Sequence, residues 1–140
     1  MRMRPALALD APRLAWIEQT QPLSAHWGEK GFAGEVANAA SRIWCWEENG
    51  EIVGFLALRL AAGMCEILNL AVLPASCRQG IGFRLLAHAL RDARARGAET
   101  VTLEVNVTNL PAISLYTKAG LAEWGRREKF YNGTDDALIM

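Results

Sequence analysis

The sequence lacks long hydrophobic runs and any excess of charge of one sign. Its apolar stretches are all far shorter than the ~20 residues that cross a bilayer, so we expect no membrane span. Fifteen Lys and Arg residues balance fifteen Asp and Glu residues. No global field therefore favours nucleic acid or an anionic membrane as a partner.

Cysteine and histidine are also scarce. Cys45, Cys65 and Cys77 are widely spaced and form no CxxC pair, which is typical of free thiols in a reducing compartment and argues against a disulfide framework and a zinc site. His26 and His88 lack metal or triad spacing, and His88 is expected on the exposed face of a helix. We therefore expect a cytoplasmic protein that binds no metal.

The composition predicts a single domain. A chain of 140 residues can bury one hydrophobic core without disulfides or metals. Because no repeat, low-complexity tract or linker-like segment interrupts it, residues 1–140 are predicted to fold as one unit. The apolar stretch near the N-terminus is short and broken by Asp10 and Pro12, so we interpret it as the start of the fold rather than as a signal peptide.

Strand and helix signals alternate along the chain. Two apolar segments flank Asn49-Gly50, the commonest two-residue hairpin turn, and a third strand is expected over 65–72. An amphipathic helix follows from Ile81, and residues 101–107 then alternate between apolar and polar. This order predicts a mixed α/β sheet with helices on its faces. The other expected elements are a helix capped by Asp10, helices over 29–40 and 110–118, and a hairpin at Asn132-Gly133.

Residues 71–87, AVLPASCRQGIGFRLLA, join a strand to a helix through a basic turn. Gly80 and Gly82 let a ligand approach the backbone closely, and the first N–H groups of the helix have no intrahelical partner. With the helix dipole and Arg78, these donors favour a phosphate-like anion. The turn lacks both GK[ST] and a third glycine, so it is neither a Walker loop nor a dinucleotide fingerprint. We predict a phosphorylated cofactor, with a simple tight turn as the alternative.

Two segments, CRQGIG over 77–82 and LEVNVTNLPAISLYTKAGL over 103–121, closely resemble the GNAT family of N-acetyltransferases. The likeness covers nearly the whole chain, including the FYNGTDDALIM ending. Within the family, the chain is most similar to the RimI type, which acetylates the N-terminal alanine of a ribosomal protein. The resemblance implies a GNAT fold of about seven mostly antiparallel strands and four helices, with the central parallel pair of strands splayed apart.

The resemblance implies acetyl-CoA as the acetyl donor, lying in a cleft between the strands near Leu70 and Val105. Main-chain groups of the strand near Leu70 would form hydrogen bonds with the pantetheine arm, and those of the glycine turn would bind the pyrophosphate. Cys77 stands where the family usually has Gln or Arg, so Arg78 or Arg84 would supply charge there. The residues expected to bind the cofactor are Leu70, Ala71, Val72, Arg78, Gln79, Gly80, Ile81, Gly82, Phe83 and Asn109.

Two side chains match the catalytic positions of the family. Glu104 would act as the base that takes a proton from the acceptor amine, and a surface carboxylate is the alternative. Tyr116 would act as the acid that protonates the leaving thiolate, because an ordinary tyrosine pKa of about 10 keeps its hydroxyl protonated; a half-buried core aromatic is the alternative. Asn109 suits a helix N-cap as well as a cofactor contact.

These assignments predict transfer of acetyl to the N-terminal amine of a protein, expected to be a ribosomal protein, by direct attack on the thioester. A GNAT enzyme for a small amine or a lysine side chain, and a non-catalytic acyl-CoA-binding module, are the alternatives. The acceptor would contact residues 23–32 and the hairpin around Phe130 and Tyr131.

Overall fold

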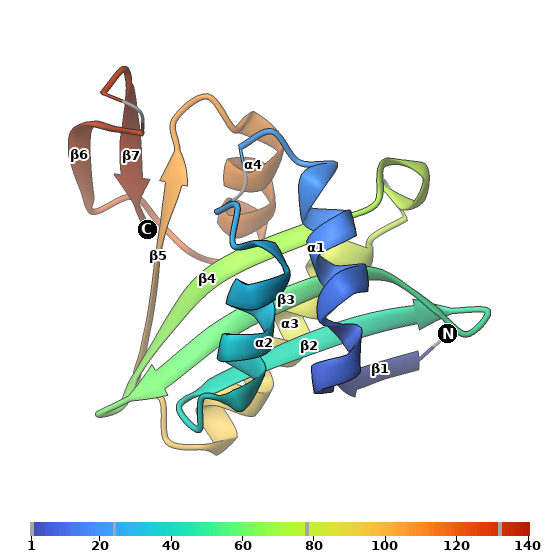
Figure 1. The fold of residues 1–140 in the computed structure, drawn as a ribbon. Coiled ribbons are helices and arrows are strands. Elements are labelled where there is room, and N and C mark those ends of the chain that lie inside the picture. Colours follow the sequence, from blue (N-terminus) through green and yellow to red (C-terminus); the bar gives the residue numbers. More distant parts are fainter. Residues whose placement is uncertain (1, 24, 78, 132) are drawn as a thin grey trace.

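The computed structural model describes residues 2–23, 25–77, 79–131 and 133–140. These residues form a seven-stranded sheet in the order β1-β2-β3-β4-β5-β7-β6, with helices on both faces (Figure 1). Neighbouring strands are antiparallel except for β4 and β5, which run parallel. The predicted mixed α/β fold is therefore confirmed. None of the described helices combines the length and apolarity that crossing a bilayer requires.

The strands are β1 (Arg2–Pro5), β2 (Ser41–Glu48), β3 (Glu51–Ala61), β4 (Met64–Val72), β5 (Thr100–Asn106), β6 (Gly125–Tyr131) and β7 (Asp135–Ile139). The α-helices are α1 (Ala11–Gln19), α2 (Gly28–Ala37), α3 (Ile81–Ala95) and α4 (Leu110–Lys118). The helix predicted over 110–118 is confirmed at both ends. The predicted β2–β3 turn is also confirmed, because Asn49 and Gly50 both have the positive φ, 52° and 79°, that such a hairpin needs. The tail hairpin is present, although Asn132 lies outside the described residues.

Two local predictions were wrong. Helix α2 ends three residues early, because the side chain of Asn38 accepts a hydrogen bond from the Ala40 N–H at 2.9 Å and turns the chain. Asp10 immediately precedes α1 but does not cap it. Its carboxylate instead accepts hydrogen bonds from the Leu7 N–H at 2.7 Å and from Arg4, because its own backbone is already helical and directs the side chain back along the chain.

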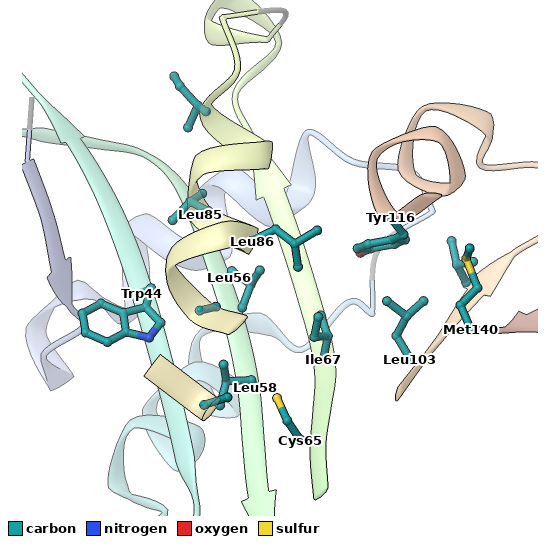
Figure 2. Packing of buried hydrophobic residues seen from close by; sticks show 14 of the residues in the cluster. Trp44, Leu56, Leu58, Cys65, Ile67, Leu85, Leu86, Leu103, Tyr116 and Met140 are labelled. Atoms are coloured by element: carbon teal, nitrogen blue, oxygen red, sulfur yellow. The ribbon is translucent and has the colours of Figure 1, made fainter. Parts of the chain in front are cut away.

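The sheet separates two hydrophobic cores. On one face, Leu85 and Leu86 of α3 pack against Leu56 and Leu58 of β3, all fully buried (Figure 2). On the other face, α1 and α2 cover the sheet with Leu14, Ile17 and Phe32. Helices thus cover both faces of the sheet and bury a core on each.

The prediction that His88 is exposed was wrong. Its ring lies edge-on against Trp44 of β2, with the ring centroids 4.2 Å apart, and the side chain is half-buried. Strand β2 extends the sheet beneath α3, so this side of the helix is covered as well. His88 therefore belongs to the packing of α3.

The parallel pair of strands comes apart midway. Strands β4 and β5 are paired only over 64–67 and 100–103. Beyond that point β5 pairs with β7 while β4 continues along β3, and Figure 1 shows β4 and β5 diverging. The split begins at a β-bulge: Ile67 pairs with Leu58 and Asn69 with Ala57, which leaves Leu68 as an extra residue. The splayed pair that the resemblance implies is therefore confirmed.

Candidate active site

A cavity of about 370 Å³ lies where β4 and β5 separate. Its walls come from β4 around the bulge, the end of β5, α4, the loop between α1 and α2, and the end of β6. Four residues predicted for the site line it together: Leu70, Glu104, Asn109 and Tyr116. The structure thus brings the predicted base, the predicted acid and two predicted cofactor contacts into one space.

Glu104 enters this cavity from the end of β5 and is held by a cation. Its Oε1 lies 2.9 Å from Nε of Arg127 on β6, and the two side chains are 26% and 56% exposed. Sequence analysis missed Arg127, because only the pairing of β7 with both β5 and β6 brings the tail hairpin beside Glu104. A carboxylate that an exposed guanidinium reaches is also within reach of an incoming amine.

Tyr116 lies deeper, on α4. Its side chain is 7% exposed, and Figure 2 shows its ring extending from α4 toward β4. Burial raises the pKa of its phenol well above the usual range, so the hydroxyl keeps its proton. Among the described residues, no hydrogen bond is made by that hydroxyl, which leaves it available to a ligand in the cavity. Tyr116 is therefore both a core aromatic and a group with access to the site.

Asn109 fixes the helix that carries Tyr116. It is the N-cap of α4, where its Oδ1 accepts a hydrogen bond from the Ala112 N–H at 3.3 Å. The predicted N-cap is thus confirmed. Because Asn109 also lines the cavity, its predicted contact with the cofactor is compatible with this position and stays a prediction.

Strand β4 presents main-chain groups to the gap. The Leu73 N–H donates to the Val53 carbonyl at 2.8 Å, and because such groups alternate along a strand, those of Leu70 and Val72 face away from β3. The Val72 carbonyl accepts a hydrogen bond from Gln21 Nε2 at 3.0 Å. Leu70, which lines the cavity, therefore directs its N–H and C=O toward the gap. Ala71 is placed differently: its side chain is buried in the core under α1 and α2, and its main-chain groups face β3.

The predicted phosphate site lies outside the cavity lining, at the start of α3. Gly80 precedes the helix with φ 78°, a left-handed conformation that glycine adopts readily. The N–H groups of Ile81, Gly82 and Phe83 have no partner within the helix. The side chain of Ile81 is buried in the core, so this residue can offer a ligand only its main chain. Gln79 is exposed beside them.

The basic side chains near the start of α3 are only partly those predicted. Arg78, the predicted phosphate partner, lies outside the described residues. Arg84 stacks over the ring of Trp46 at 5.8 Å. Sequence analysis missed Lys118 on α4, whose Nζ lies 4.7 Å from the centre of the Phe83 ring. This ammonium brings a positive charge to the first turn of α3.

No group of three metal-ligating side chains occurs among the described residues. Residues 6–121 match the profile of the Acetyltransferase (GNAT) family, and the chain belongs to this family. The match confirms the resemblance and, with it, the prediction of an acetyl-CoA-dependent N-acetyltransferase.

Several similar proteins are acetyltransferases that are named for their acceptors. The chain is 34% identical over 139 residues to the [ribosomal protein bS18]-alanine N-acetyltransferase of Escherichia coli K12, covering 94% of this chain and 89% of that protein. It is 36% identical over 119 residues to the streptothricin acetyltransferase of Streptomyces lavendulae, covering 81% of this chain and 62% of that protein. The crystal structure of the ribosomal-protein-S18-alanine N-acetyltransferase from Escherichia coli has a TM-score of 0.88 at 30% identity, covering 99% of this chain and 90% of that chain.

Proposed function

We propose that this protein transfers an acetyl group from acetyl-CoA to the N-terminal α-amine of a protein, with Glu104 as base and Tyr116 as acid. One observation carries the proposal: both side chains line the cavity that opens beside the free main-chain groups of Leu70. The Escherichia coli relative is a ribosomal protein bS18-alanine N-acetyltransferase. This supports a ribosomal protein as the acceptor, and the cytoplasm, where such proteins are made, as the place of action.

The proposed reaction uses the two side chains in turn. Acetyl-CoA supplies an activated thioester, whose pantetheine arm would lie along Leu70 and Val72 and whose pyrophosphate would rest on the first turn of α3. Glu104 takes a proton from the acceptor ammonium, directly or through water. The neutral amine attacks the thioester carbon and forms the C–N bond. As the C–S bond breaks, the Tyr116 hydroxyl donates its proton to the departing thiolate. The nitrogen then loses its second proton to water, water returns a proton to the Tyr116 oxygen, and Glu104 releases its own proton to solvent. No covalent intermediate with the protein is required.

A single carboxylate suits an α-amine better than a lysine. An N-terminal amine has a pKa near 7.7, so roughly one molecule in six is neutral at pH 7. For lysine, with a pKa near 10.4, the neutral fraction is about one in 2,500, and the difference is ~3.7 kcal/mol. The α-amine therefore needs far less help from Glu104.

The rim of the cavity suits the end of a chain. Leu23 from the loop between α1 and α2 is 42% exposed, and Phe130 from β6 is 48% exposed; both line the cavity. Because these wall residues also face solvent, the space opens outward between the two segments expected to contact the acceptor. An N-terminal residue can enter there while the rest of its chain stays outside.

Acetyl-CoA consumption tests the proposal. The acceptors are a ribosomal peptide that begins with Ala, the same peptide with its N-terminus blocked, free lysine and streptothricin. We expect turnover with the open peptide and none with the blocked one, even if it contains lysine. Preference for streptothricin would favour the second candidate, a small-molecule acetyltransferase, which the likeness to the Streptomyces enzyme supports. Equal turnover of both peptides would point to lysine side chains.

A further inference from the structure

A buried carboxylate lies behind the acceptor side of the cavity. This carboxylate is that of Glu18, which lies near the end of α1 and is only 2% exposed. Its Oε2 accepts hydrogen bonds from the Trp27 N–H and from Asn69 Nδ2, both at 2.8 Å, and its Oε1 accepts one from the Gly28 N–H at 3.1 Å. These donors, three of them among the described residues, offset the cost of burying the charge of the carboxylate.

These donors come from two separate elements. Trp27 and Gly28 form the start of α2, so the carboxylate satisfies N–H groups that a helix leaves open and complements the helix dipole. Asn69 belongs to β4 and is 6% exposed. It follows the bulged Leu68, and the extra residue turns Asn69 toward the face covered by α1. Glu18 therefore joins the start of α2 to the splayed part of β4.

A second contact holds the other end of the same loop. Gln21 Nε2 donates to the Val72 carbonyl at 3.0 Å, so residues on both sides of the loop between α1 and α2 are fixed to β4. Leu23 and Ala25, which line the cavity, lie between these two attachments. The wall that the acceptor would meet is thus built on the strand that would hold the acetyl donor.

We propose that Glu18 and Asn69 are positioning residues that set Leu23 and Ala25, in the loop between α1 and α2, as the acceptor-binding wall; this rests on the proposed function. Neither residue transfers a proton in the reaction. Their bonds fix how far Leu23 and Ala25 stand from the donor strand, and a wall that is already in place binds a substrate more tightly than one that must first be ordered. The phosphate-binding turn lies at the start of α3, apart from these bonds, and β4 is held in place by its pairing with β3. We therefore expect the bonds of Glu18 to affect the acceptor much more than acetyl-CoA.

The variant Glu18→Gln tests the proposal with little change in shape. Its amide keeps one acceptor oxygen and turns an NH₂ group toward backbone N–H donors, which weakens the attachment of the loop. We expect KM for the acceptor to rise about tenfold or more, while KM for acetyl-CoA stays within about twofold. Asn69→Ala should give the same split in KM, and it serves as the test if Glu18→Gln does not fold.

Asp10→Asn is the matched control. Asp10 is also buried, with 5% of its surface exposed. Its carboxylate accepts hydrogen bonds from the Leu7 N–H and from the guanidinium of Arg4. Asp10 does not line the cavity. Both variants should lower the melting temperature, but only Glu18→Gln should raise KM for the acceptor. An equal effect of the two variants on that KM would overturn the proposal and leave Glu18 a purely structural residue.

Hydrogen exchange separates this inference from the proposed function. The amides of Trp27 and Gly28 should be protected in the wild-type chain and exchange faster in Glu18→Gln, while calorimetry finds unchanged acetyl-CoA affinity. Unaltered protection would overturn the inference whatever the enzyme acetylates. Kinetics are measured with whichever amine the wild type turns over, so failure with peptides alone refutes only the proposed acceptor.

Discussion

Arg127 Nε lies 2.9 Å from Glu104 Oε1, so a cation of the protein itself occupies the carboxylate that we assign as the base. An acceptor ammonium that comes to Glu104 must share the carboxylate with this guanidinium or take its place. The contact therefore competes with the substrate in the resting enzyme. The half-exposed position of Arg127 makes the exchange inexpensive, because ion pairs open to water are weak.

Removal of this competitor should help the acceptor to bind. Exposed ion pairs contribute about 0.2–1 kcal/mol, so Arg127→Ala should lower KM for the acceptor about 1.5- to 5-fold in steady-state kinetics. Arg126→Ala is the control, because Arg126 pairs with Glu123 and Asp136 instead. A large loss of kcat in Arg127→Ala would instead mean that the guanidinium orients Glu104 for the reaction.

Glu104→Gln should separate chemistry from cofactor binding. General base catalysis contributes about 10²- to 10⁴-fold, so kcat should fall within that range, while acetyl-CoA affinity by calorimetry stays unchanged. Glu128→Gln, an exposed carboxylate on β6, is the control and should retain full activity. If Glu104→Gln turns over like the wild type, another group or bulk water takes the proton.

Tyr116→Phe should lower kcat about 10²-fold without weakening acetyl-CoA binding. Because burial raises the pKa of Tyr116, the phenol stays protonated as the pH rises through the value of about 10 for a free tyrosine. Ionisation of this group therefore causes no loss of activity between pH 8 and 10, and the pH–rate profiles of both proteins should share one alkaline shape. An alkaline limb that disappears in Tyr116→Phe would contradict this assignment.

The three thiols should differ sharply in reactivity. Burial raises the pKa of Cys45 to about 12 and that of Cys65 to about 11, and both are fully buried, whereas Cys77 is exposed. At pH 8, a thiol-specific chromogenic disulfide should titrate one thiol rapidly in the native protein and all three after unfolding. Cys77→Ser should abolish the rapid phase. Two rapid thiols in the native protein would show that a core opens readily.

Local patterns predicted the elements well. The Asn49-Gly50 turn and the helix over 110–118 depend on short-range chemistry and were correct. Strand β1 was not identified, because it is four residues long, carries two arginines and is stabilised by pairing with β2, forty residues away. Its four residues do alternate between charged and apolar side chains, but so short a run cannot be told from chance in a sequence pattern.

Only those site residues that belong to a family motif could be predicted from the sequence. The LEVNV and SLYTKAGL segments identified Glu104 and Tyr116, and both lie in the cavity. The bulge at Leu68, the Glu104–Arg127 ion pair and the bonds of Glu18 depend on register between distant segments. Glu18 in particular follows an apolar residue on a helix, a pattern typical of a solvated side chain, and only the tertiary fold buries it.

The two strands that border the gap, β4 and β5, differ in how they are supported. Strand β4 is backed by β3 along its whole length and by α1 and α2 on one face. Among the described residues, the end of β5 pairs only with β7 of the short β6–β7 hairpin, and its other edge faces the gap. We therefore expect any widening of the gap to occur on the side of β5, so that Glu104, the proposed base, would shift toward the incoming amine while the strand proposed to hold the thioester stays in place.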